Sequence, residues 1–145
     1  MRKKSEAQLK LEQVEKLDAM IKNKLIEQQQ WKEVALGITA NMGGERVQSS
    51  GTKSKMADAV EKCIDIEAEI NNLIDKLIDA KREAIALIEQ VDSAVWYNIL
   101  HMRFIQYRDL SEIAAYYGKE YDWATSTQGR ALANVQKIID KRKSL

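Results

Sequence analysis

A seven-residue repeat of apolar side chains between residues 56 and 91 constrains the fold more than any other feature of this chain. Two positions of the repeat are apolar almost throughout, as the seam of a coiled coil requires. One position holds Met56, Cys63, Ile70, Leu77, Ala84 and Val91, and the other holds Ala59, Ile66, Leu73, Ala80 and Leu87. The repeat predicts a single long helix with a seam of about five heptads.

This helix has more apolar surface than one seam needs. The additional apolar residues are Val60, Ile64, Ile74, Ile78, Ile85 and Ile88. They widen the stripe beyond that of a two-stranded coiled coil, so we expect the helix to contact more than one neighbour.

A second long helix is expected before it, from Ser5 to near Met42. Its apolar residues recur at steps of three, four or seven, with Lys24 and Gln28 interrupting the seam. These residues are Val14, Leu17, Ile21, Trp31, Ala35, Ile38 and Met42. The segment Gly43–Thr52 has turn-forming residues and no apolar period, which predicts a flexible connector.

The two helices have matched lengths of about 55 Å each, so they can fold back as an antiparallel hairpin. The same stripe would also be buried if they paired with another chain, and we expect a homo-oligomer through the long helices. Residues 1–92, with the connector near 43–54, are therefore predicted to form a coiled-coil hairpin, and residues 93–145 a separate small domain.

Residues 93–145 carry the signals of a helix-turn-helix. Asp92 and Ser93 are capping residues ahead of a short apolar segment, and Asp109-Leu110-Ser111-Glu112 has the pattern of a capping box. Gly118 suits the left-handed position that ends the next helix. A last helix is expected to direct apolar side chains inward. These are Ala124, Ala131, Leu132, Val135 and Ile138. Since proline is absent and no strand pattern occurs, the predicted fold class is all-α.

The C-terminal residues resemble region 4 of bacterial sigma factors. The segments concerned are Ile99–Phe104, Leu110–Ala114, Gly118 and Arg130–Leu132. Further segments extend the likeness to a family of phage and prophage proteins with a long helical N-terminal part and a sigma-region-4-like end. These segments are Glu45–Ser50, Lys55–Val60, Asp79–Glu83 and Gly129–Leu132. The resemblance implies a phage-type transcriptional regulator that binds DNA in the bacterial cytoplasm, with RNA polymerase as a further partner.

In such a unit the second helix enters the major groove. The resemblance places Tyr121, Asp122, Thr125 and Ser126 at base edges and Lys119 and Arg130 at phosphates. Asp122 has an alternative role as the cap ahead of Trp123, and Arg130 could instead pair with Glu112 or another carboxylate.

Charge argues for weak DNA binding by this unit alone. Between Arg103 and Gln136 four basic residues are balanced by four acidic ones, and phosphate neutralisation supplies most non-specific affinity. Dimerisation, RNA polymerase or the basic end would have to supplement it. This end consists of Lys137, Lys141, Arg142 and Lys143. The alternative function is a helical adaptor that docks on RNA polymerase or another protein without contacting DNA.

Other functional classes find little support in the sequence. His101 is the single histidine and no nucleophile with a base can be assembled, so we expect neither a metal site nor a cofactor nor an enzyme. Cys63 has no partner for a disulfide, and it is expected to fill the seam. No apolar run approaches the roughly 20 residues that span a bilayer, so we expect no membrane partner. We expect a cytoplasmic location.

Overall fold

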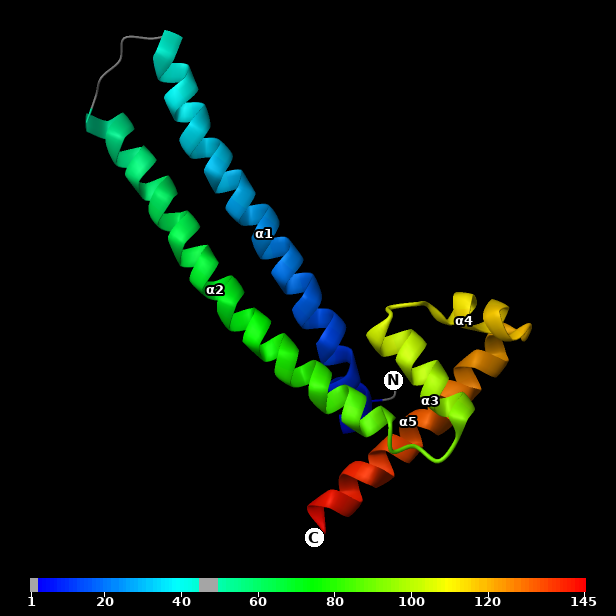
Figure 1. The fold of residues 1–145 in the computed structure, drawn as a ribbon. Coiled ribbons are helices and arrows are strands. Elements are labelled where there is room, and N and C mark those ends of the chain that lie inside the picture. Colours follow the sequence, from blue (N-terminus) through cyan, green and yellow to red (C-terminus); the bar gives the residue numbers. More distant parts are fainter. Residues whose placement is uncertain (1–2, 45–49) are drawn as a thin grey trace. The chain divides into compact units, whose positions relative to one another are not determined.

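The computed structural model describes residues 3–44 and 50–145, and the side chains of 3–37 and 54–145 within them. All regular structure in these residues is helical, which confirms the all-α prediction. The elements are α1 (Glu6–Gly44), α2 (Ser50–Ile88), α3 (Ala94–Leu100), η1 (His101–Ile105), α4 (Leu110–Tyr117) and α5 (Tyr121–Lys143). Helices α1 and α2 form a long antiparallel hairpin within one chain, and α3, α4 and α5 form a small three-helix unit after it (Figure 1).

The two long helices extend further than the sequence pattern predicts. Gly43 and Gly44 belong to α1, and Ser50, Gly51 and Thr52 belong to α2, so the ten-residue connector is shortened. A helix already nucleated by many packed turns adds each further residue at small cost, even where that residue is a poor helix former. Residues 45–49 lie outside the described part of the chain.

The described residues divide into two compact units. Unit 1 comprises Met1–Leu17 and Leu77–Leu145, and unit 2 comprises Asp18–Lys76. Unit 1 therefore joins the start of α1 and the end of α2 to the C-terminal helices. The predicted boundary at residues 92 and 93 falls inside it, and independent folding of residues 93–145 stays a prediction.

The main core lies in unit 1 and draws on α1, α2 and α5, which are distant in sequence, and on α3 and η1. Leu11 and Val14 of α1, Leu87 of α2 and Val135 of α5 are fully buried in one cluster. Its other buried members are Ala7, Ala84, Ile88, Leu100, Phe104, Ala131, Leu132 and Ile139. Ile88, which lies outside the heptad seam, is buried here with residues of α5. The wide apolar stripe of α2 thus meets a second neighbour, as its pattern predicts.

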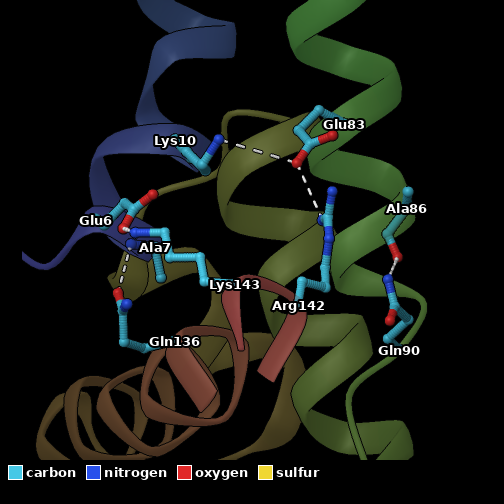
Figure 2. Close-up of polar contacts among 9 residues, drawn as sticks. All are labelled: Glu6, Ala7, Lys10, Glu83, Ala86, Gln90, Gln136, Arg142 and Lys143. Atoms are coloured by element: carbon cyan, nitrogen blue, oxygen red, sulfur yellow. Dashed lines mark hydrogen bonds and ion pairs between the residues drawn. The ribbon is translucent and has the colours of Figure 1, made fainter. Parts of the chain in front are cut away.

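Polar contacts fasten α5 within this unit. The Gln136 side chain accepts a hydrogen bond from the backbone N–H of Ala7 at 2.9 Å, and Glu83 lies between Lys10 and Arg142 (Figure 2). Arg142 Nη1 is 3.2 Å from Glu83 Oε1. At the other side of α5, Asn134 bonds both the backbone N–H and the carboxylate of Asp92. These contacts connect α5 to the beginning of α1, to Glu83 of α2 and to Asp92 between α2 and α3.

Unit 2 is a simpler structure with a narrow seam. Ile21 of α1 and Ile66, Ile70 and Leu73 of α2 are buried along it. Lys24 and Gln28 occupy the next seam positions on α1, where Lys24 Nζ lies 2.7 Å from Glu69 Oε2. The two polar residues that interrupt the predicted pattern are therefore accommodated by partners on α2.

Candidate nucleic-acid interface

The C-terminal helices are built by local capping signals that the sequence predicts. Ser93 caps α3 by accepting from the backbone N–H of Trp96 at 3.3 Å. Asp109 and Glu112 form the capping box that starts α4, with Asp109 Oδ1 accepting from the Glu112 N–H at 2.8 Å. Gly118 ends α4 with φ of +63°, in the left-handed region that suits glycine. Helices α4 and α5 are thus joined by a short turn at Gly118 (Figure 1).

A π-helical turn separates α3 from α4. In η1 the backbone N–H of Gln106 bonds the carbonyl oxygen of His101, five residues earlier, at 3.0 Å. Tyr107 follows with φ of +62°, which is a strained conformation for a residue with a side chain. No sequence signal of turn type marks this position, because Tyr is not a residue that favours it.

Helix α5 begins at Tyr121, earlier than the interpretation of Asp122 as its N-cap assumes. Its N-cap is Glu120, whose extended backbone directs its carbonyl oxygen to the N–H of Trp123 at 3.0 Å. Asp122 therefore lies inside the first turn, and the interpretation of Asp122 as the cap ahead of Trp123 is wrong. A carboxylate at that place is still favourable, since the helix dipole is positive at its N-terminus.

All six residues that the resemblance places at DNA are exposed. These residues are Lys119, Tyr121, Asp122, Thr125, Ser126 and Arg130. The opposite side of α5 is anchored by Ala124 and Thr127, which are buried, and by Trp123, which packs on the small core of Ile99, Met102 and Ile113. The structure thus brings the predicted residues together on the free surface of one helix and its preceding turn.

The six residues divide into a centre and two flanks. At 100° per residue, Asp122, Thr125 and Ser126 share an arc of about 100°, whereas Tyr121 and Arg130 point to opposite sides of the helix. The centre has short side chains and continues into Gly129 and Ala133. Lys119 stays beside the helix start, with Nζ 6.0 Å from the ring centroid of Trp123. If α5 lay in the major groove of DNA, the centre would face the base edges at the floor of that groove, and Tyr121 and Arg130 would face its two walls.

Arg130 is available for an external anion. It forms no ion pair within the described part of the chain, so the interpretation that it pairs with Glu112 is wrong. Glu112 instead accepts weakly from the backbone N–H of Asp109 at 3.4 Å, as part of the capping box. Arg130 lines a groove of about 300 Å³ with Lys137, Asp92 and Trp96.

A second groove brings two lysines from the start of the chain beside Lys137 of the predicted basic end. Lys3 and Lys4 lie with Gly129 and Lys137 around a groove of about 580 Å³ on the neighbouring side of α5. Lys4 is also paired with Glu12 at 2.8 Å. We call Lys3, Lys4, Arg130 and Lys137 the basic flank. Arg130 and Lys137 were expected from the sequence, whereas Lys3 and Lys4 have their place in the basic flank only because the start of α1 packs beside α5.

Two residues of the predicted basic end have carboxylate partners within the protein. Arg142 is paired with Glu83, and Lys143 is paired with Glu6, whose hydrogen bond raises the pKa of Lys143 (Figure 2). These two residues thus stabilise unit 1 and are less available to phosphates than Lys137 and Lys141. The connector residue Arg46, the best candidate for a contact outside the tail, lies outside the described residues.

Other kinds of site are not found in the part of the chain that the structure describes. No group of three or more His, Cys, Asp or Glu side chains is placed to hold a metal ion among residues 3–37 and 54–145. Among these described helices none combines the length and apolarity that crossing a bilayer requires.

Comparison of the chain with models of known families, with curated proteins and with solved structures gives no match.

Proposed function

We propose that this protein binds duplex DNA through α5 and acts as a phage-type transcriptional regulator. The observation that carries the proposal is the exposed face of α5 directly after the Gly118 turn, with Asp122, Thr125 and Ser126 at its centre. Short side chains there allow the helix backbone to approach base edges closely. The likeness of the C-terminal segments to sigma region 4 supports the same arrangement.

The basic flank supports DNA binding on electrostatic grounds. Lys3, Arg130 and Lys137 border the two grooves beside α5, and Asp92, the acidic residue that lines one of them, is bonded to Asn134. These cations supplement the first turns of α5, which contain the carboxylate of Asp122 and no basic side chain that could contact a phosphate. Arg130 and Lys137 hold the phosphates in the proposal, and the centre of α5 reads base edges.

Fluorescence anisotropy with duplexes enriched from a random pool tests this function. Arg130→Ala should weaken binding to all duplexes by about tenfold, since one phosphate contact is lost. Ser126→Ala should change which duplex is preferred while affinity for the pool changes by less than about threefold. Arg82→Ala is the matched control, because Arg82 is exposed on α2 and has no ion pair within the described residues. Equal losses for Arg130→Ala and Arg82→Ala would contradict the proposal.

The acidic character of the first turn of α5 favours a second candidate, an adaptor that docks on RNA polymerase. Glu120 and Asp122 flank Tyr121, which is 54% exposed, and Tyr116 on α4 is 62% exposed. Tyrosine is enriched in protein interfaces, and the rim of such an interface is polar. Sedimentation with purified RNA polymerase, without DNA, distinguishes the two: Tyr121→Ala would abolish co-sedimentation of an adaptor.

A further inference from the structure

An uncovered apolar face runs along the hairpin in unit 2. Val60 and Ile64 of α2 and Leu36 of α1 line a shallow groove of about 430 Å³, and they are 51%, 61% and 68% exposed. Leu25 lies one heptad before Lys32, which also lines the groove, and Ile74 lies two heptads after Val60, so both continue the same face. We call Leu25, Leu36, Val60, Ile64 and Ile74 the apolar face.

The opposite side of the α2 segment in unit 2 has a different character. On this side, the heptad position next to the seam holds Lys62, Glu69 and Lys76, which are all charged and exposed. The flanking position on the other side of the seam holds Val60, Glu67 and Ile74, so it is apolar at two of three places. An apolar stripe widened on one flank is the pattern of a helix with a second helical neighbour on that flank. In unit 1 the same stripe of α2 has such a neighbour, because Ile88 is buried with residues of α5.

From this contrast we infer that a second copy of the chain covers the apolar face, so that two hairpins form a four-helix bundle. The charged residues that line the groove are Lys32 and Glu67, one of each sign, so two identical faces approach without net repulsion. A partner whose surface carries many charges of one sign would gain no net electrostatic attraction from a groove lined by one lysine and one glutamate.

The size of the face fits a dimer interface. Gln28 and Cys63 lie at one level of the hairpin, since Gln28 Nε2 donates to the Cys63 carbonyl oxygen at 3.1 Å. Leu36 follows Gln28 by eight residues and Ile74 follows Cys63 by eleven, so the face is about 28 Å long at 1.5 Å per residue. Two helices of about 10 Å diameter give it a width of about 20 Å. Two copies would then bury about 1,100 Å², above the roughly 1,000 Å² of a specific interface.

Sedimentation equilibrium of the full chain, from about 1 to about 100 μM, tests the inference. The wild-type protein should show twice the chain mass of 16.6 kDa. Val60→Glu should weaken dimerisation by at least about a hundredfold, because it buries an unpaired carboxylate in the interface. Val34→Glu is the matched control, since Val34 is 44% exposed on the side of α1 away from the groove, and it should change the dissociation constant less than about threefold.

Circular dichroism of each variant verifies its helical content, and Ile64→Lys replaces Val60→Glu if that variant unfolds. A monomer across the whole concentration range would overturn the inference, as would equal effects of Val60→Glu and Val34→Glu. A monomer that joins purified RNA polymerase through Val60 would also overturn it, in favour of another occupant. The inference does not depend on DNA binding: a monomer that still binds duplex DNA would contradict the dimer alone.

Discussion

Gln28 and Cys63 bond each other's main chain across the hairpin. Gln28 Nε2 donates to the backbone oxygen of Cys63 at 3.1 Å, and Cys63 Sγ lies 3.8 Å from the backbone oxygen of Gln28. Both side chains occupy seam positions that an ordinary coiled coil fills with larger apolar residues. A polar residue at one seam position favours a single alignment of two helices, because any shift leaves it without a partner. This pair therefore sets the register of α1 and α2 within unit 2.

Removal of the Gln28 amide should destabilise the hairpin. We expect Gln28→Ala to lower the free energy of unfolding by about 1 kcal/mol relative to Gln29→Ala, since a partly buried hydrogen bond is lost. Gln29 is the matched control, because its exposed side chain bonds Glu33 on its own helix only. Urea unfolding followed by circular dichroism measures both variants. Indistinguishable unfolding curves would show that the Gln28–Cys63 contact adds no stability.

Two glycines of the C-terminal helices should respond in opposite ways to alanine. Gly118→Ala should destabilise the fold by about 1 kcal/mol, because its φ of +63° is unfavourable for a residue with Cβ. Gly129→Ala, inside α5, should stabilise it by up to about 1 kcal/mol, because alanine is the better helix former. A Cβ at either position would meet no atom within 4 Å, so backbone conformation alone separates them. Thermal unfolding gives the sign, and a stabilising Gly118→Ala would refute the left-handed turn.

The ion pair of Lys143 and Glu6 should give a pH dependence at the alkaline end. The hydrogen bond to Glu6 raises the pKa of Lys143 above its usual 10.5. A raised pKa in the folded state means that the contribution to stability is complete below 10.5 and is lost as the pH rises through the folded value. We expect the urea midpoint of wild type to fall more steeply above pH 10.5 than that of Lys143→Gln. Parallel profiles of the two proteins would contradict a role of this pair in stability.

The local structure of the C-terminal helices was predictable because its causes act over three or four residues. Ser93, the Asp109 and Glu112 box and Gly118 each satisfy backbone groups of the adjacent turn, and such chemistry is visible in sequence. The heptads of α2 were predictable for the same reason. The alternative in which Asp122 caps α5 is wrong by two residues, because Asp is a preferred capping residue whereas Glu120 occupies the cap position with no side-chain capping bond.

The long-range arrangement was not predictable from the pattern. Leu11 and Val135 share one core although 124 residues separate them in the chain, and no periodicity encodes which apolar stripes meet. The same holds for the basic end: Arg142 and Lys143 have carboxylate partners only because α5 packs beside α1 and α2. In the candidate interface, the exposure of the five residues on α5 follows from helical spacing, while the position of Lys3 and Lys4 beside α5 follows from tertiary packing.

The salt dependence of DNA affinity tests the central proposal most directly. Anisotropy titrations of a labelled duplex at several salt concentrations give the slope of log K against log salt, which is about −0.9 for each phosphate neutralised. Since Lys4 is paired with Glu12, the other three residues of the basic flank predict a wild-type slope near −3, and the Arg130→Ala/Lys137→Ala double variant should fall to about −1. Arg142→Ala/Lys143→Ala removes the same charge from residues paired with Glu83 and Glu6 and should leave the slope unchanged. No saturable binding at low salt, or an equal loss of slope in the two double variants, would contradict the account.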